Sequence, residues 1–584
     1  MSDPLPDAKF ISWRSCLSRE AVLLVALITF ARLLYIAFFC PYNLVEDEAQ
    51  YWVWSLRPDW SYYSKGPGIA WSIWLSTGIF GNSEFGVRVL APIYAAIAAL
   101  AVAGLSADVF RGIGFPPDVS FAKHVDSSRR AGLIGAAIFL LIPAFTLSGT
   151  FLMTIDGPML ACWAIACWAG FRALYRASRS AWLVLGIALG IGFLFKYTIA
   201  LLIPSLIIAA ILERKHIKTA RYRRPLILIV LVCISLGLLP IAIWNQQNGW
   251  PAIAHFLGHA KLPGGDSVPS PQSARYNPKW LFEFLGIQLA AAGPVLFLMW
   301  LGFRSTALPP GETSFAEKAD QLRRSAAVYL ACMGLTTLVF YFFATFLTSV
   351  EANWPMGGFV SLVPLAAMAV VRGMADWRER MARWLAIAPG SRPREGILLK
   401  RPETPAQIAW HLTLAYGILV SILILRLDLI ARIPGVTDRV ALHRLLGAPQ
   451  FADAIHKLSI QHTQAEYGPA FGPPLLISYH YGVAAQLTFY LPDHPMVFVA
   501  GSRLGYRRTQ WDLWPDMSLS QFSLVGKNAL CIGGTAAQWA PAFRTLTDLG
   551  HQPEDLRKDR WVYFGENFLG FDHPSGDAGT GGGS

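Results

Sequence analysis

Residues 45–54 read VEDEAQYWVW and directly follow an apolar run at about residues 20–40. The run is long enough to cross a bilayer, so charged and aromatic side chains stand where a membrane helix has just emerged. They are Glu46, Asp47, Glu48, Tyr51, Trp52 and Trp54. Stop-transfer signals use Lys and Arg, so an acidic cluster here has no anchoring purpose. Carboxylates beside aromatic rings at a membrane boundary favour proton abstraction, cation binding or sugar recognition, and a solvated acidic loop is the alternative.

Composition predicts an α-helical polytopic membrane protein. Of the 584 residues, 54% are apolar and only 15% are charged, and the mean hydropathy is +0.41. A spanning helix needs roughly 20 mostly apolar residues, and about eleven stretches qualify, although the two between 181 and 212 are short. They lie at about 20–40, 86–110, 131–150, 158–175, 181–196, 198–212, 225–244, 280–302, 325–346, 356–373 and 407–427.

The distribution of Lys and Arg predicts the orientation in the membrane. The N-terminal tail and the loops on its side hold about 28 of these residues, whereas the opposite loops hold about six, and basic loops stay in the cytoplasm. We therefore expect the N-terminus inside and the acidic cluster and the C-terminal part outside. The net charge of +12 lies mostly in loops that face anionic lipid, so it does not indicate nucleic-acid binding.

The chain is expected to divide after residue 427. The membrane part is 1–427, with outer-face loops at 41–85, 150–157, 245–279 and 347–355. In 428–575, strand-like runs alternate with polar turns, which predicts a small α/β domain. Strands are expected within 475–491, 495–501, 529–534 and 561–571, and helices at 439–447 and 538–549. The Gly-rich residues 576–584 are interpreted as a linker outside the fold.

Separate outer loops bring charged or polar side chains to the same membrane face. They are Asp47 and Glu48, Lys65 in YYSKGPG, Asp156 in TIDGP, Lys196 in FLFKYT, and Glu351 with Asn353 in VEANWP. An unpaired ionisable group near the hydrocarbon costs on the order of 2–3 kcal/mol, so such groups gather where they share a water-filled cavity. Taken singly, each has a structural explanation: Asp156 could cap a helix, and Lys196 could reach the interface by its length.

The ordered strings EDEAQYW, SKGPG, IDGP and EANWP resemble the GT-C membrane glycosyltransferases. The similarity is to the branch that contains the protein O-mannosyltransferases and the bacterial lipid A aminoarabinose transferase. It implies transfer of a sugar from a polyprenyl phosphate donor, of the undecaprenyl or decaprenyl type, to a cell-envelope acceptor. The acceptor would be lipid A, lipopolysaccharide core or another glycan or lipid. The place would be the periplasmic face of a bacterial inner membrane, with the N-terminus cytoplasmic and the C-terminal α/β domain periplasmic.

Within this resemblance, Asp47 is the expected general base for an acceptor hydroxyl, a role worth about 10²–10⁴ in rate. Glu48 and Asp156 would orient the acceptor, the sugar or a cation. Lys65 and Lys196, with Arg88 as a further candidate, would stabilise the departing phosphate. The expected substrate-binding residues are Tyr51, Trp52, Tyr62, Tyr63, Glu351 and Asn353. A single displacement would invert the anomeric carbon.

Two departures from the aminoarabinose transferase pattern concern a metal and the donor sugar. The acid that precedes the first-loop lysine there, and helps to hold a metal, is Ser64 here, and an arginine just beyond the Asp-Glu pair is Gln50. We therefore expect no required cofactor. The candidate ligands of a weakly bound divalent cation are Asp47, Asp156 and His259. Both departures argue against aminoarabinose as the donor sugar.

Three other functions stay open. A flippase or transporter of a polyprenyl-linked sugar also needs many spans, but transporters place charges at the midplane within a two-fold repeat, and no repeated half is visible. A protein O-mannosyltransferase would need outer domains that grip peptides, and none is evident besides 428–575. An assembly or sensor protein is the last alternative. We expect a monomer that binds membrane lipids.

Overall fold

The computed structural model forms two compact units, each built from several segments of chain. The first unit comprises Met1–Cys40, Arg88–Pro240 and Tyr276–Arg426, and the second comprises Pro41–Val87, Ile241–Arg275 and Leu427–Ser584. The residues that the structure describes are 17–112, 121–176, 178–214, 223–259, 262–266, 276–305, 314–386, 404–430, 444–465, 468, 470–553 and 560–571. The expected linker at 576–584 lies outside them.

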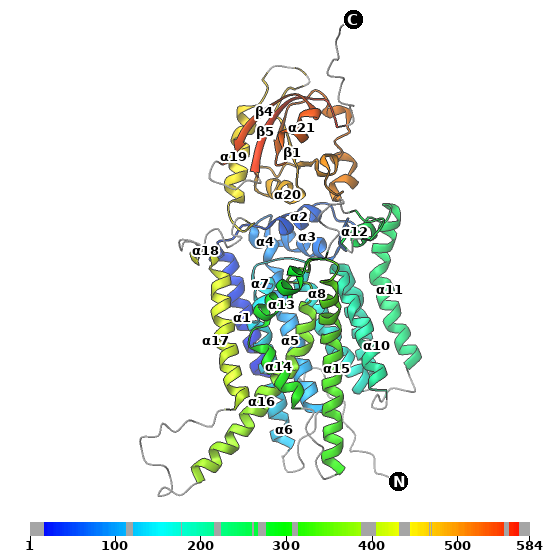
Figure 1. The fold of residues 1–584 in the computed structure, drawn as a ribbon, viewed down its shortest axis with the longest axis vertical. Coiled ribbons are helices and arrows are strands. Elements are labelled where there is room, and N and C mark those ends of the chain that lie inside the picture. Colours follow the sequence, from blue (N-terminus) through cyan, green and yellow to red (C-terminus); the bar gives the residue numbers. More distant parts are fainter. Residues whose placement is uncertain are drawn as a thin grey trace. The chain divides into compact units, whose positions relative to one another are not determined.

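The first unit is a bundle of helices (Figure 1). They are α1 (Arg19–Phe38), α5 (Leu90–Gly112), α6 (Phe121–Leu141), α7 (Pro143–Thr150), α8 (Asp156–Tyr175), α9 (Arg179–Phe195), η2 (Tyr197–Leu201), α10 (Leu202–Leu212), most of α11 (Arg223–Gln247), α13 (Lys279–Ala292), α14 (Val295–Arg304), α15 (Ser314–Ala344), α16 (Met356–Ala386) and α17 (Pro405–Leu425).

Among the described residues, seven helices are long and apolar enough to cross a membrane. Two helix pairs, α6 with α7 and α13 with α14, pass the same test together but bend by 76° and 86°, which gives up to nine spans. Proline begins α7 and glycine followed by proline separates α13 from α14, and both residue types interrupt helices. The expected spans 181–196 and 198–212 correspond to the shorter helices α9 and η2–α10. The architecture is therefore polytopic and helical.

Helix α8 is buried along nearly its whole length and packs against α5, α9 and α16. Small residues let the helices approach closely, since a Cβ at Gly104 of α5 would collide with the Trp168 ring. Near the C-terminal end of α8, Arg172 forms a buried ion pair with Asp108 of α5 at 3.2 Å. The indole of Trp168 donates to the same carboxylate at 2.7 Å. These contacts hold α8, and with it Asp156 at the first residue of the helix.

The second unit contains a five-stranded sheet in the order β2-β1-β3-β5-β4. Strands β1, β2 and β3 are parallel to one another, whereas β5 is antiparallel to both β3 and β4. The strands are β1 (Leu475–Ser478), β2 (Phe498–Val499), β3 (Ala529–Ile532), β4 (Phe543–His551) and β5 (Trp561–Phe568). Its helices are α2 (Glu46–Ser55), α3 (Gly68–Phe80), α4 (Glu84–Arg88, whose last residue falls in the first unit), α12 (Pro251–His259), α18 (Leu427–Ile430), α19 (Ala448–Gln461), α20 (Tyr481–Tyr490) and α21 (Ala536–Trp539). Its 3₁₀ turns are η6 (Gly501–Leu504), η7 (Gln510–Leu513), η8 (Pro515–Met517), η9 (Phe522–Leu524) and η10 (Ala540–Ala542).

Two of the predicted elements of this part were wrong. Residues 538–549 were predicted as a helix, but most of them form strand β4, because their backbone pairs in register with β5. Residues 475–491 were predicted as strand, but only 475–478 are, and α20 begins at Tyr481 after the His480 side chain accepts from the Gly482 amide. Helix α20 is buried on nearly all sides, and its apolar run does not distinguish it from a buried strand. The predicted helix 439–447 lies largely outside the described residues.

Candidate functional site

Three connections of the first unit bring Asp156, Lys196 and Asn353 together. The ammonium of Lys196 contacts Asp156 Oδ1 at 2.6 Å, and the Asn353 side chain donates to Asp156 Oδ2 at 2.7 Å. Only 11% of the Lys196 side chain and 6% of the Asp156 side chain are exposed. A charge pair this buried needs good geometry and further hydrogen bonds to be stable, and Asn353 supplies one. The sequence placed these residues on one membrane face but did not predict that they would be partners.

Local structure explains how each side chain reaches this cluster. Asp156 is the first residue of α8, where the helix dipole and the unpaired amides favour a carboxylate. Lys196 has an extended backbone that separates α9 from η2, so its side chain leaves the helical ladder. Asn353 precedes α16 in the connection that follows α15. The cluster is therefore built at helix ends.

Two other predicted residues of the first unit lie in different settings. The Arg88 side chain is buried, with its guanidinium 5.7 Å from the centre of the Phe151 ring and 3.6 Å from Cys40 Sγ. Glu351 is exposed. Of the VEANWP motif, Asn353 therefore contacts the Asp156 carboxylate.

In the second unit, the acidic cluster begins helix α2. Glu48 is fully buried, and its Oε2 accepts a hydrogen bond from the Val45 amide at 3.1 Å, which satisfies an amide that the helix leaves unpaired. Glu46 lies 3.5 Å from His480 Nδ1. Asp47 is exposed, and its charge acts on His480 and Tyr481. Of the three carboxylates, Glu48 has a clear structural role and Asp47 stays accessible.

The aromatic residues expected to bind sugar are mostly packed into the second unit. Trp52 is fully buried, packs edge-on against Phe489 at 4.8 Å and donates to Asn82 at 3.1 Å. Tyr62 stacks on Trp54 with ring centres 4.6 Å apart. Tyr51 is also buried, as is Tyr63. Because their side chains are buried, these residues belong to the core of the second unit, and the Tyr63 hydroxyl also joins a polar cluster.

That polar cluster contains two histidines and a carboxylate that the sequence did not group. Asp266 Oδ2 accepts from the Tyr63 hydroxyl at 2.9 Å and lies 3.0 Å from His255 Nδ1. His255 Nε2 is 3.1 Å from His259 Nε2, one helical turn along α12. The spacing of four residues between the histidines was the available signal, because such pairs share a helix face. Tyr63 and Asp266 are far apart in the sequence, so nothing local predicted that they would join these histidines.

The electrostatics of this cluster favour neutral histidines. Burial lowers the pKa of His255, as do the charges on Lys65 and Arg507, and together they outweigh the hydrogen bond that His255 donates to Asp266. Burial and the neighbouring His255, Lys65 and Arg507 lower the pKa of His259 to about 4. Outside this cluster, burial and Arg507 lower the pKa of His480 to about 4 as well. Burial raises the pKa of Asp266, but the hydrogen bonds from His255 and Tyr63 and the charge on Arg507 leave it lowered overall. At pH 7 the carboxylate is therefore charged and both imidazoles are neutral.

These shifts predict a loss of thermal stability in mild acid. The folded-state pKa values of His255 and His480 lie below the ordinary 6.5, so the unfolded chain binds protons first. The stability contribution of both groups is present above about pH 6.5 and is lost as pH falls through their lowered pKa values, which for His480 is about 4. Thermal-shift assays should show Tm falling by several degrees over this interval. His255→Gln and His480→Gln should each flatten the slope.

The residues do not fit a metal centre. In the described part of the chain, no group of three or more His, Cys, Asp and Glu is arranged to hold a metal ion. Both carboxylate oxygens of Asp156 are engaged, by Lys196 and by Asn353, and His259 is hydrogen-bonded to His255. We therefore derive no step that uses a metal.

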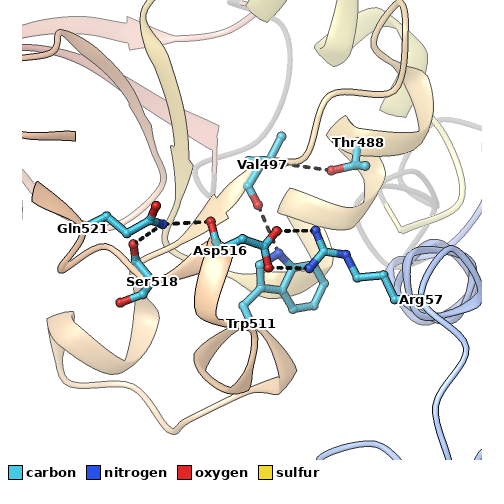
Figure 2. Close-up of polar contacts among 7 residues, drawn as sticks. All are labelled: Arg57, Thr488, Val497, Trp511, Asp516, Ser518 and Gln521. Atoms are coloured by element: carbon cyan, nitrogen blue, oxygen red, sulfur yellow. Dashed lines mark hydrogen bonds and ion pairs between the residues drawn. The ribbon is translucent and has the colours of Figure 1, made fainter. Parts of the chain in front are cut away.

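A second feature that the sequence did not predict is the segment that follows β2. Arg507 and Tyr506 lie in the turn between η6 and η7, and Gln510 accepts from the Tyr63 amide at 2.7 Å. Figure 2 shows how the segment is held: Arg57 donates to both carboxylate oxygens of Asp516, at 2.8 and 2.6 Å, and Trp511 donates to the Val497 carbonyl at 3.0 Å. This segment is thereby joined to Tyr63 and to the residues after α2.

The fold of this chain resembles that of solved ArnT structures. The structure aligns with ArnT from Cupriavidus metallidurans bound to undecaprenyl phosphate, over 95% of this chain and 99% of that one, with a TM-score of 0.55 and 15% identity. The apo state of the same protein aligns with a TM-score of 0.53 over 93% of this chain and 97% of that one, at 14% identity. At such identities the alignment shows a shared fold.

Sequence comparisons point to the same branch. Residues 123–244 match the family described as dolichyl-phosphate-mannose-protein mannosyltransferase. The chain is 30% identical over 261 residues to the lipid A galacturonosyltransferase RgtD of Rhizobium johnstonii, which covers 44% of this chain and 49% of that protein. It is 25% identical over 224 residues to the undecaprenyl phosphate-alpha-4-amino-4-deoxy-L-arabinose arabinosyl transferase of Pseudomonas savastanoi, over 38% of each protein. The matched regions thus span at most about half of these relatives, and the resemblance to the ArnT-like branch of the GT-C superfamily is confirmed.

Proposed function

We propose that this protein is an integral membrane glycosyltransferase. It moves a sugar from a polyprenyl phosphate donor to a lipid or glycan of the bacterial cell envelope. The proposal is supported by the fold shared with an ArnT bound to undecaprenyl phosphate and by relatives named as sugar transferases. The single observation that carries it is the convergence of Asp156, Lys196 and Asn353 from three separate connections, because a fold alone does not imply a function.

The chemistry assigns a role to each group. The acceptor hydroxyl attacks the anomeric carbon, and the bond from that carbon to the phosphate oxygen breaks. The bonding electrons leave with the polyprenyl phosphate, whose growing negative charge is stabilised by a fixed cation, and this is the role of Lys196. The proton of the hydroxyl passes to the carboxylate of Asp47. One displacement inverts the anomeric configuration.

Asp156 acts through Lys196. Its carboxylate holds the ammonium at 2.6 Å and fixes its direction, so the cation needs no reorganisation when the phosphate departs. Lys65 supplies a second cation for the donor phosphate. If the acceptor is itself a phosphate, its oxygen is already anionic and no base is required.

The proposed membrane arrangement has eleven spans. Up to nine of them are supported by length and composition in the described residues, and the shorter α9 and η2–α10 supply the other two. The N-terminus is cytoplasmic, and the 428–575 domain is periplasmic. Helix α3 lies in the outer interface, because Trp74, Leu75 and Ile79 are exposed on it and such side chains suit the headgroup region. The protein acts as a monomer in the inner membrane.

Transfer by the purified protein tests the proposal. A panel of radiolabelled undecaprenyl-phosphate sugars is incubated with a total envelope lipid extract, with wild type and Asp156→Asn in parallel. Product from one donor, reduced in the variant, supports the transferase and identifies its sugar. Movement of a donor across vesicle membranes without any product would overturn the proposal in favour of a flippase.

A further inference from the structure

Arg507 is held by two tyrosines in the turn between η6 and η7. Its guanidinium carbon is 5.3 Å from the centre of the Tyr481 ring and 5.8 Å from that of Tyr506. Nη2 donates to the Tyr481 hydroxyl at 3.3 Å. A cation over aromatic faces is stabilised by their electron density, and stacking fixes the plane of the guanidinium. The direction of its N–H groups is therefore set before any ligand arrives.

Arg507 is a partly buried cation that forms no ion pair with any carboxylate in the described parts of the chain. A guanidinium carries five N–H donors, and the tyrosine hydroxyls use only part of this fork. Partly buried arginines usually have a carboxylate partner, because removing a charge from water is costly. The remaining donors of Arg507 suit an anion with two oxygens that accept hydrogen bonds at once, such as a carboxylate or a phosphate.

The surroundings of Arg507 join the two polar clusters of this unit. Its charge acts on Asp266, His255 and His259 on one side. On the other side, Tyr481 lies within the field of Asp47, the expected base. Asp266 takes its hydrogen bonds from Tyr63 and His255 rather than from Arg507. The charges of Arg507 and Asp47 therefore both act on His480 and Tyr481.

The segment that carries Arg507 is anchored at several points. Arg57 donates two hydrogen bonds to the Asp516 carboxylate, and its guanidinium also lies 4.6 Å from the centre of the Trp514 ring. Gln521 donates to the carbonyls of Asp516 and Ser518, both at 2.8 Å (Figure 2). A binding residue on a braced segment loses less conformational freedom when it engages a ligand.

We propose that Arg507 binds an anionic group of a substrate, either the carboxylate of a uronic acid on the donor lipid or a phosphate on the acceptor. Both present oxygens at the spacing of the guanidinium fork. The inference rests on the proposed function and extends it, since it makes the C-terminal part of the chain contribute to substrate recognition. A neutral hexose on an unphosphorylated acceptor would gain nothing from Arg507.

The test compares matched lipids. Donors are undecaprenyl-phosphate galacturonic acid and undecaprenyl-phosphate galactose, and acceptors are lipid A and its dephosphorylated form. Transfer kinetics are measured for wild type, Arg507→Gln, Arg507→Lys and Arg503→Gln, an exposed arginine on η6 that serves as control. Loss of a charge-assisted pair should lower kcat/KM for the anionic substrate by about 10–100-fold in Arg507→Gln. Arg507→Lys should recover part of the loss, and Arg503→Gln should match wild type.

The substrates for which kcat/KM falls in Arg507→Gln identify the source of the anion. Loss with galacturonic acid but not galactose assigns Arg507 to the donor sugar, and loss only with phosphorylated acceptors assigns it to the acceptor. Equal loss with all four combinations, or no loss with any, overturns the inference. If wild type transfers neither of these two sugars, the inference is judged separately, from ligand-induced shifts in Tm, and the donor panel described above decides the proposed function. In that case, galacturonic acid or phosphorylated lipid must shift wild type more than Arg507→Gln.

Discussion

Replacing Lys196 by methionine is expected to reduce kcat by about 10²–10³-fold, the usual cost of losing a fixed stabiliser of transition-state charge. The departing phosphate then gains negative charge without the cation that Asp156 holds at 2.6 Å. Stability should fall as well, by about 3–5 kcal/mol, because one member of a buried pair is left uncompensated. Initial rates at saturating donor and thermal-shift midpoints measure the two effects separately.

The double variant Lys196→Met with Asp156→Asn separates catalysis from folding. Removing both charges eliminates the uncompensated carboxylate, so most of the lost stability should return, and Asn353 still has an oxygen to which it can donate. Activity should not return, since no cation is present. A double variant that regains both would show that the pair is only structural and would remove Lys196 from the mechanism.

Replacing Asp47 by asparagine is expected to lower kcat by about 10²–10⁴-fold for an acceptor with a free hydroxyl, the usual contribution of a general base. Because Asp47 is exposed, its replacement should change the free energy of unfolding by no more than about 0.5 kcal/mol. Asp47→Asn is therefore expected to lose only activity, whereas Lys196→Met is expected to lose both activity and stability.

The neighbour Glu46 provides the control for Asp47. Glu46→Gln removes the same charge one residue away and is expected to retain activity within about threefold, because long-range charge effects at the surface are screened. An unchanged rate in Asp47→Asn with a hydroxyl acceptor would show that another group takes the proton. A small effect with a phosphate acceptor would instead agree with a nucleophile that is already ionised.

Much of the membrane architecture could be predicted from hydropathy. The seven long apolar helices coincide with expected spans because a continuous apolar run of sufficient length has few other stable arrangements. The bends between α6 and α7 and between α13 and α14 were not predicted, although Pro143 and Pro294 stand at them. A proline indicates an interruption but not the angle that packing imposes.

The polar clusters were only partly predictable, because pairing depends on contacts between residues far apart in the chain. The sequence singled out Asp156, Lys196 and Asn353 by their position at helix ends. It did not predict the ion pair, which joins residues 40 positions apart. Tyr62 and Trp52 were expected to face the sugar, yet aromatic rings beside a polar loop can equally fill a core, and the structure buries both. Arg507 was not singled out, since nothing local marks an arginine that two tyrosines will hold.

The discontinuous second unit also has a consequence for how the protein is made. Arg57 and its partner Asp516 are 459 residues apart, and the Asn43 amide donates to the carbonyl of Leu445. At synthesis rates of 5–20 residues per second, the early segment waits roughly 20–90 s for its partners after it leaves the ribosome. During that time the membrane helices between them are inserted. Completion of the C-terminal segment is therefore the event that lets the first outer loop reach its final conformation.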